Sequence, residues 1–197
     1  MIHNKCSNII LFLFIVAILT SCADLNQQAE NVIGSIDPQG IDVSATTARA
    51  QIISRALVWV ELGVPYNQGK ERDGYRTDCS GFISYAWDLK DANGQSISPD
   101  TVALGNNYAS DISLDDIQGG DIINNKRAGN NGHTVLFVSW ANDDHTRFIA
   151  YEENGGYGKA IQSELTIEYL TNGSFTIKDY ENDAPGPYYA QVSPNVP

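Results

Sequence analysis

The segment TDCSGFISYAW, residues 77–87, joins a turn-forming aspartate to a short apolar run. Asp78 is a good helix N-cap, so we expect a helix that begins at Cys79 and runs to about Leu89. The sulfur of Cys79 then lies in the first helical turn, where unpaired backbone N–H groups and the helix dipole favour thiolate over thiol. The segment therefore predicts a nucleophilic cysteine at a helix N-terminus.

The start of the chain has the pattern of an export signal. A nearly unbroken apolar run, residues 9–19, follows Lys5 and suits a secretory signal better than a membrane span of about 20 residues. The run ends in LTSC, residues 19–22, which resembles the bacterial lipobox. We expect a signal peptide over residues 1–21, lipid on Cys22 and a flexible tether over residues 22–45. An ordinary signal peptide or an uncleaved anchor is the alternative.

The signal also decides the state of the cysteines. Cys6 leaves with the signal peptide and Cys22 carries lipid, so Cys79 has no disulfide partner within the chain. The alternative is an inert, buried thiol, which is the commonest fate of a free cysteine. The polar neighbours Asp78 and Ser80 favour the nucleophile.

Composition limits the classes of partner. The chain has 197 residues, 12 basic and 24 acidic, with a formal net charge of −12 and 42% hydrophobic residues. This is a globular composition, and the acid surplus without a basic cluster argues against nucleic-acid binding. Neither zinc-ligand nor calcium-loop spacing occurs, so we expect no metal and no cofactor. We expect a monomer.

Helical spacing comes before strand patterns along the chain. Apolar spacing predicts a helix from Thr46 or Thr47 through Leu62, followed by a polar loop up to Thr77. A short helix is expected at 104–108, strands at 121–123, 133–140, 147–152, 160–165 and 174–180, and an irregular segment or a final edge from Pro185. Helices followed by antiparallel strands predict an α+β domain over residues 46–190.

One histidine is placed to act as a base. His133 opens the strongest predicted strand, in GHTVLFV at residues 132–138, and a strand fixes side-chain direction better than a loop does. A solvated histidine at a strand end is the alternative. His145 lies in a polar hairpin tip, where solvation is the default, and His3 belongs to the signal.

A base needs a group that orients it, and the next strand offers two carboxylates. In FIAYEEN, residues 148–154, alternation puts Glu152 and Glu153 on opposite faces. Glu152 is favoured, since Glu153 can already belong to the following turn. Two surface charges without a catalytic role are the alternative.

The remaining expected site residues surround the sulfur. The backbone N–H of Cys79 and the hydroxyl of Tyr66 are candidate donors to an oxyanion, and Asp78 and Ser80 complete the expected substrate-binding set. A packing or surface tyrosine is the alternative for Tyr66.

Taken together, these motifs resemble the NlpC/P60 family of papain-like cysteine peptidases and amidases. The resemblance covers about residues 49–169 and rests on PY at 65–66, DCSGF at 78–82, GD at 120–121 and GH at 132–133. It implies a papain-like α+β fold with helices packed on an antiparallel sheet. It also implies Cys79 as nucleophile, His133 as base, Tyr66 as the loop tyrosine, and cleavage of amide bonds in peptidoglycan stem peptides, typically next to D-glutamate.

Two features depart from the family pattern. The strand after the base carries Glu152 and Glu153, whereas family members commonly orient the base with a second histidine or another polar residue. The segment between helix and base is also longer and more polar.

With lipid on Cys22, the expected location is the cell envelope, anchored to a membrane. A catalytically silent lipoprotein that binds peptide or glycan, and a thiol amidase on a non-wall substrate, remain the alternatives.

Overall fold

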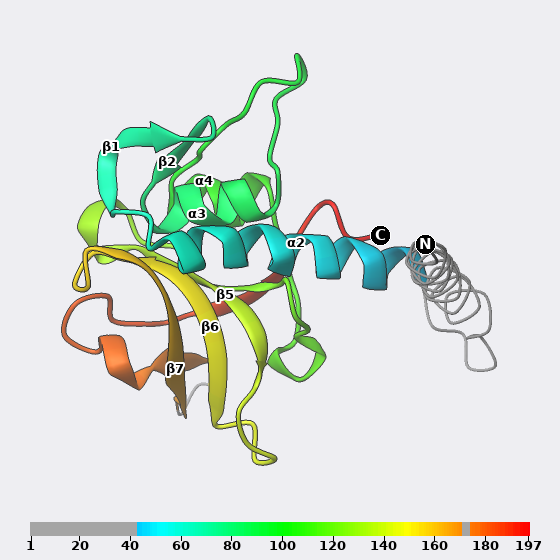
Figure 1. Ribbon diagram of the computed structural model, residues 1–197. Coiled ribbons are helices and arrows are strands. Elements are labelled where there is room, and N and C mark those ends of the chain that lie inside the picture. The colour runs from blue at the N-terminus through cyan, green and yellow to red at the C-terminus, as the bar shows by residue number, and fades with distance from the viewer. Residues whose placement is uncertain (1–42, 171–173) are drawn as a thin grey trace, which may run out of the picture. The chain divides into compact units, whose positions relative to one another are not determined.

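The computed structural model describes residues 43–170 and 174–197 (Figure 1). The expected signal peptide, Cys22 and most of the expected tether lie outside these residues. The described part contains three α-helices: α2 (Val43–Leu62), α3 (Cys79–Ala86) and α4 (Thr101–Asn107). None of the helices in this part is both long enough and apolar enough to span a bilayer.

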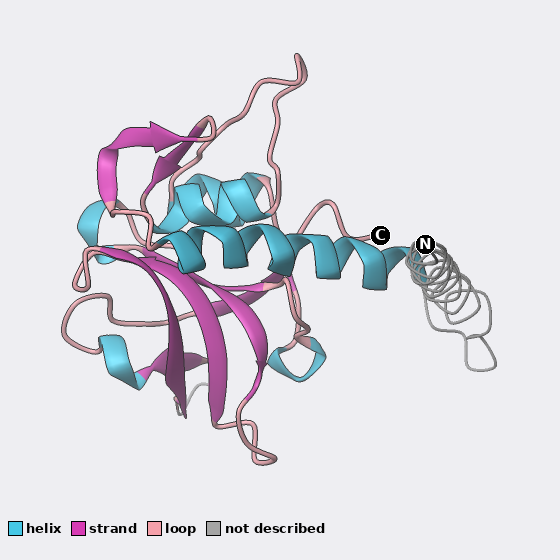
Figure 2. Cartoon of the chain, viewed as in Figure 1, coloured by secondary structure: helices cyan, strands magenta, loops and turns pink. Residues whose placement is uncertain are grey.

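Seven antiparallel strands form the main sheet, in the order β3-β9-β4-β5-β6-β7-β8. Their bounds are β3 (Ser110–Asp111), β4 (Ile122–Asn125), β5 (His133–Trp140), β6 (Arg147–Asn154), β7 (Lys159–Tyr169), β8 (Phe175–Ile177) and β9 (Tyr189–Val192). Helix α3 packs on β5 and β6, and α2 packs on β6 and β7. Figure 2 shows these helices together over one side of the sheet. The predicted α+β class, with helices on an antiparallel sheet, is confirmed.

The loop expected before the cysteine is a β-hairpin. Strands β1 (Asn67–Arg72) and β2 (Tyr75–Thr77) pair across a turn in which Asp73 and Gly74 both have positive φ. Every residue of β1 is exposed, so its sequence NQGKER lacks the apolar alternation by which a strand is recognised. The prediction of a polar loop over this segment was wrong for this reason.

Helix α3 ends three residues earlier than expected. Trp87 is its C-cap, and Asp88 follows with φ +53°. The N–H of Leu89 donates to the carbonyl of Ser84, and that of Asp88 to Tyr85, which is a Schellman ending. Because an aspartate occupies the left-handed position that is usually glycine, the sequence carries no visible stop signal.

The bounds of two other helices and the structure of the C-terminal segment also differ from the predictions. Helix α2 begins at Val43, inside the segment expected to be tether, and α4 begins at Thr101 because the Asp100 side chain caps it, accepting from the N–H of Ala103 at 2.8 Å. Strand β9 corrects the expectation for the C-terminal segment. It is neither irregular nor an edge, but lies inside the sheet between β3 and β4.

The core has two parts, one on each face of the sheet. Residues alternate along β5, so Leu136 faces the helices whereas Val135 and Phe137 face away from them. The helix-side cluster centres on the fully buried side chains of Trp59, Phe82, Ile83 and Trp87. This packing holds α3, and with it Cys79, against the start of β5.

Candidate active site

Asp78 sets the start of helix α3. Its backbone is extended (φ −117°, ψ 179°) and its Oδ1 accepts from the N–H of Gly81 at 2.8 Å, as predicted for an N-cap. A Cβ on Gly81 would collide with the carbonyl oxygen of Arg76, so only glycine lets α3 approach strand β2 this closely. Cys79 is the first helical residue, 8% exposed. Within the described residues it is the only free cysteine.

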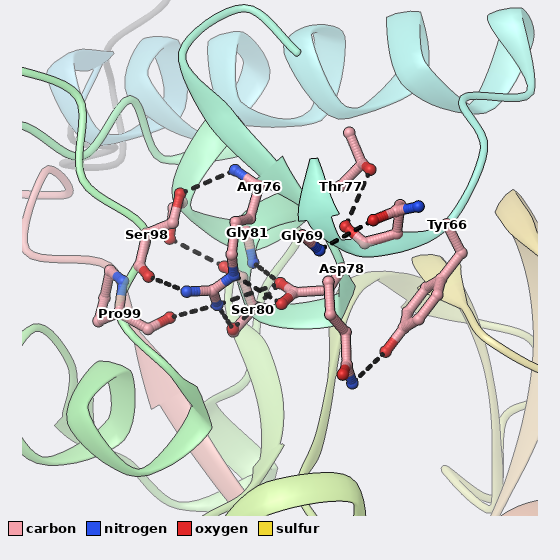
Figure 3. A network of polar contacts seen from close by, with 12 residues as sticks. Tyr66, Gly69, Arg76, Thr77, Asp78, Ser80, Gly81, Ser98 and Pro99 are labelled. Carbon is pink, nitrogen blue, oxygen red and sulfur yellow. Dashed lines mark hydrogen bonds and ion pairs between the residues drawn. The ribbon is translucent and has the colours of Figure 1, made fainter. Parts of the chain in front are cut away.

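Arg76 holds this N-terminus from outside the helix (Figure 3). Its guanidinium contacts both carboxylate oxygens of Asp78, at 2.7 and 3.2 Å, and donates to Ser80 Oγ at 2.9 Å. It also donates to the carbonyl of Ser98 at 2.6 Å. Asp78 and Ser80 line the pocket described below. Their side chains, however, form hydrogen bonds with Arg76, and Asp78 also accepts from Gly81. Their predicted contact with substrate stays a prediction.

The predicted base and orienter are in direct contact. His133 Nε2 lies 2.9 Å from Glu152 Oε2. The Cys79 side chain is near enough to the imidazole to help raise the pKa of His133. Because Nε2 faces the carboxylate, Nδ1 is the nitrogen left for the sulfur. Three elements thus bring together the residues that the sequence singled out: Cys79 on α3, His133 on β5 and Glu152 on β6.

The pair of His133 and Glu152 carries opposite charges. Burial alone would lower the pKa of His133, but the hydrogen bonds to Cys79 and Glu152 and their charges raise it to about 10. Burial would raise the pKa of Glu152, but the hydrogen bonds from His133, Ser163 and Tyr180 lower it below its ordinary value. At neutral pH the site therefore holds an imidazolium against a carboxylate.

Three donors to Glu152 were missed in the sequence. Tyr180 donates to both carboxylate oxygens at 2.7 Å, Ser163 to Oε1 at 2.5 Å and Asn154 to Oε2 at 3.0 Å. The ring of Tyr180 also packs edge-on against that of His133, with centroids 4.8 Å apart. Asn154 was detectable, since it lies two residues after Glu152 and so on the same strand face. Tyr180 lies in the 3₁₀ helix η3 (Lys178–Tyr180) and gives no such local signal.

Glu153 is not a turn residue, contrary to expectation, because β6 continues to Asn154. Its side chain is fully buried on the opposite face from Glu152, and neither carboxylate oxygen has a hydrogen-bond partner. Burial, followed by the negative charge of Asp78, raises its pKa to about 8. Neither glutamate is the surface charge that the alternative interpretation required.

Cys79, His133 and Tyr180 border a pocket of about 890 Å³. Its walls come from the hairpin before α3, from the loop that leads to His133, from the β6–β7 turn and from the segment around Tyr180. Tyr66 is on one wall, where its hydroxyl accepts from Gln68 Nε2 at 3.2 Å. Burial and the nearby charge of Cys79 raise the pKa of Tyr66, so its hydroxyl keeps its proton and can donate.

Gly132, the residue before the base, and His145, the other histidine of the described residues, have different surroundings. A Cβ on Gly132 would collide with the carbonyl of Arg127 and the hydroxyl of Thr101, so glycine lets the chain enter β5 in front of the pocket. His145 lies at the exposed β5–β6 hairpin tip, stacked on Trp140 with centroids 4.4 Å apart. In the part of the chain that the structure describes, no group of three or more His, Cys, Asp or Glu side chains is arranged to hold a metal ion.

The arrangement can perform acyl transfer. It combines a thiol at a helix start, an imidazolium beside it, a buried carboxylate behind the imidazolium and an open pocket in front. A search of curated proteins finds no match to the chain. The model of the NlpC/P60 family matches residues 63–191, which include Cys79, His133 and Glu152. Members of that family are generally cysteine peptidases and amidases, and the family acts on peptidoglycan peptides. The fold, the extent of this match and the residues within it show that the chain belongs to the NlpC/P60 family.

Proposed function

We propose that the protein is a cysteine hydrolase that cleaves amide bonds in the stem peptides of bacterial peptidoglycan, with Cys79 as nucleophile, His133 as acid and base, and Glu152 as orienter. The observation that supports this most directly is the position of His133, which lies 2.9 Å from Glu152 and whose pKa is raised by both Cys79 and Glu152. The family match supports the class of substrate.

In the first half of the reaction the sulfur attacks the scissile carbonyl. The adjoining imidazolium and the start of α3 stabilise negative charge on the attacking sulfur. The carbonyl oxygen becomes an oxyanion, for which the backbone N–H of Cys79, without an intrahelical partner at this position, and the hydroxyl of Tyr66 are the donors. His133 then gives its proton to the leaving amine, so that the C–N bond breaks and a thioester remains on Cys79.

In the second half water hydrolyses the thioester. His133, now neutral, takes a proton from the attacking water, the C–S bond breaks and the carboxylic acid leaves. Glu152 keeps the imidazole in the orientation that both transfers need and stabilises it each time it becomes charged. Because Glu152 is itself held by other side chains, it does not rotate away between the two steps.

The test is digestion of purified sacculi, with products identified by mass spectrometry. The wild-type protein should release stem-peptide fragments, and Cys79→Ala and His133→Ala should release none while keeping the wild-type circular dichroism spectrum. His145→Ala is the matched control, because that histidine is exposed and belongs to the hairpin tip. Fragment release by Cys79→Ala at the wild-type rate would overturn the proposal.

Alkylation separates this function from that of a silent peptide- or glycan-binding protein. At neutral pH iodoacetamide should modify Cys79 much faster than an ordinary cysteine, and His133→Ala should remove the difference. A thiol that reacts slowly in the wild-type protein would favour the binding protein. A fast thiol without fragment release would favour an amidase that acts on a non-wall substrate.

We further propose that the protein is anchored to a membrane of the cell envelope through lipid on Cys22. The support is the sequence LTSC at residues 19–22 after an apolar run. The wild-type protein should sediment with membranes and incorporate labelled fatty acid, whereas Cys22→Ser should do neither. Membrane association without label in the wild-type protein would contradict a lipid anchor and indicate an uncleaved apolar segment.

A further inference from the structure

Asn154 uses both ends of its side-chain amide, each for a different part of the site. Its Nδ2 donates to Glu152 Oε2 at 3.0 Å, and Oε2 is the same oxygen that contacts His133. Its Oδ1 accepts from the N–H of Gly156 at 2.8 Å and from that of Tyr157 at 3.2 Å. The side chain is part of a residue only 9% exposed, so these bonds are poorly accessible to competing water.

The turn that Asn154 holds is a wall of the pocket. Gly155, Gly156 and Tyr157 all line the pocket, and Tyr157 is 72% exposed, the most exposed large hydrophobic side chain in the described residues. Tyr66 is attached to the same turn, since its N–H donates to the carbonyl of Gly158 at 2.9 Å. An exposed aromatic ring on a fixed turn is a surface on which a ligand can pack at low entropic cost.

One amide therefore joins the carboxylate behind the base to the wall that faces the ligand. If the turn moved, the Oδ1 bonds would pull on the amide, and its Nδ2 would no longer meet Glu152. Loss of the bond to Glu152 would equally free the amide to leave the turn. We infer that Asn154 is a positioning residue of the hydrolase, which fixes the Gly155–Tyr157 wall relative to Glu152 and His133. The test by kcat and KM rests on the proposed function. The test by the pH dependence of Cys79 alkylation rests only on the hydrogen bonds of Asn154.

Two substitutions separate the two ends of the amide. Asn154→Ser keeps an oxygen that can accept from the turn N–H groups, as serine does in such turns, but has no N–H₂ group to reach Glu152. Its kcat on stem-peptide fragments should fall about tenfold, the effect of one lost hydrogen bond to a charged group, with KM nearly unchanged. Asn154→Ala loses both ends, so kcat should fall similarly and KM should also rise, roughly fivefold, because the wall loses its fixed shape.

A second readout needs no substrate. The rate of Cys79 alkylation against pH reports the imidazolium beside the sulfur, since the rate changes when His133 loses its proton. In both Asn154 variants Glu152 is less well oriented, so His133 should lose its proton at a lower pH. The alkaline limb of the plot of alkylation rate against pH should therefore shift to lower pH. This shift is expected even if the protein does not cleave sacculi, so failure of the proposed function and failure of this inference are distinguishable.

The β5–β6 hairpin provides the matched control. Asn142 Oδ1 accepts from the N–H groups of Thr146 and Arg147 at 3.1 and 3.0 Å, the same kind of turn contact, at the hairpin that carries exposed His145. Asn142→Ala should leave kcat, KM and the alkylation profile as in the wild-type protein. The inference is overturned if both Asn154 variants match the wild-type protein in kcat and alkylation profile, or if Asn142→Ala reproduces their changes.

Discussion

Two adjacent residues of one type, Glu152 and Glu153, end with opposite protonation behaviour. Both side chains are fully buried. Glu152 accepts hydrogen bonds from four side chains. Burial would raise its pKa, but His133, Ser163 and Tyr180 lower it, whereas Glu153 has no hydrogen-bond partner, and burial and the charge of Asp78 raise its pKa to about 8. Because successive strand residues face opposite sides of a sheet, one position decides which glutamate is a stable anion.

Glu153→Gln should stabilise the protein at pH 8 but not at pH 4.5. The pKa of Glu153 is about 8 in the folded protein and near the ordinary 4.5 in the unfolded chain. A raised folded pKa means that the stability present below pH 4.5 is lost as pH rises to about 8. Gln cannot ionise, so the difference in unfolding free energy from urea melts should grow over this interval. Exposed Glu168→Gln is the control, and a difference independent of pH would contradict the prediction.

Glu152→Gln should impair catalysis without unfolding the protein. Removal of its charge takes away one of the causes that raise the pKa of His133, so the alkaline limb of Cys79 alkylation should move to lower pH. Fragment release should fall roughly 100-fold in kcat/KM, the range for a misplaced general acid and base. Glu164→Gln, at an exposed ion pair with Arg147, should retain activity. Wild-type kinetics in Glu152→Gln would exclude an orienting role.

At the scale of elements, one ion pair ties helix α2 to the turn before β4. Arg49 Nη1 lies 2.6 Å from Asp121 Oδ1, and the Asp121 side chain is completely buried. The N–H of Gln118 donates to the other oxygen of that carboxylate at 2.8 Å. Burial outweighs these bonds and raises the pKa of Asp121. The Gly120-Asp121 motif thus serves to dock α2 against the sheet and lies apart from the catalytic contacts.

Arg49→Met should destabilise the protein strongly at pH 7, by about 3 kcal/mol, because it leaves a buried carboxylate without its charge partner. The loss should shrink as pH falls towards the pKa of Asp121, since a protonated carboxyl needs no cation. Urea unfolding at pH 7 and pH 4.5 measures both effects. Arg147→Met breaks an exposed pair with Glu164 and should change the unfolding free energy by less than about 1 kcal/mol. Equal losses in the two variants would contradict the role of burial.

At the scale of the whole molecule, the C-terminal strand completes the sheet. Strand β9 pairs with both β3 and β4, and its Gln191 is fully buried. The Gln191 side chain accepts from Asn124 Nδ2 at 2.9 Å and donates to the carbonyl of Gly105 at 2.9 Å. The last strand in the sequence therefore joins the sheet to helix α4, whose first residue, Thr101, lines the pocket.

Two neighbouring substitutions test this placement of β9. Ala190 is 3% exposed in the core, whereas Tyr189 is 38% exposed. Ala190→Asp should lower the unfolding free energy by about 3 kcal/mol or more, since it buries a charge without a partner, and Tyr189→Asp by about 1 kcal/mol or less. Thermal melts followed by circular dichroism measure both. If residues 189–192 formed an irregular tail, both variants would melt like the wild-type protein.

Local signals in the chain were enough for part of this picture. An aspartate before a helix and an apolar run after His133 identified the start of α3 and the strand β5. Alternation put Glu152 and Glu153 on opposite faces, but the choice of Glu152 as the partner of His133 rested on a turn at Glu153 that β6 does not make. Signals of this kind involve residues two to four positions apart, because the regular geometry of a helix or a strand fixes the directions in which nearby side chains point.

The amino-acid sequence by itself determined the α+β class and the N-capped helix start at Cys79. It also indicated that His133 pairs with a glutamate of the next strand, either Glu152 or Glu153, which lie on opposite faces. Only the tertiary structure decided that β9 lies inside the sheet, that Tyr180 and Ser163 hold Glu152, and that Glu153 is buried without a partner. These contacts join residues far apart in the chain or depend on what covers a strand face. No local pattern encodes them, because they arise only when the strands pair and the helices pack.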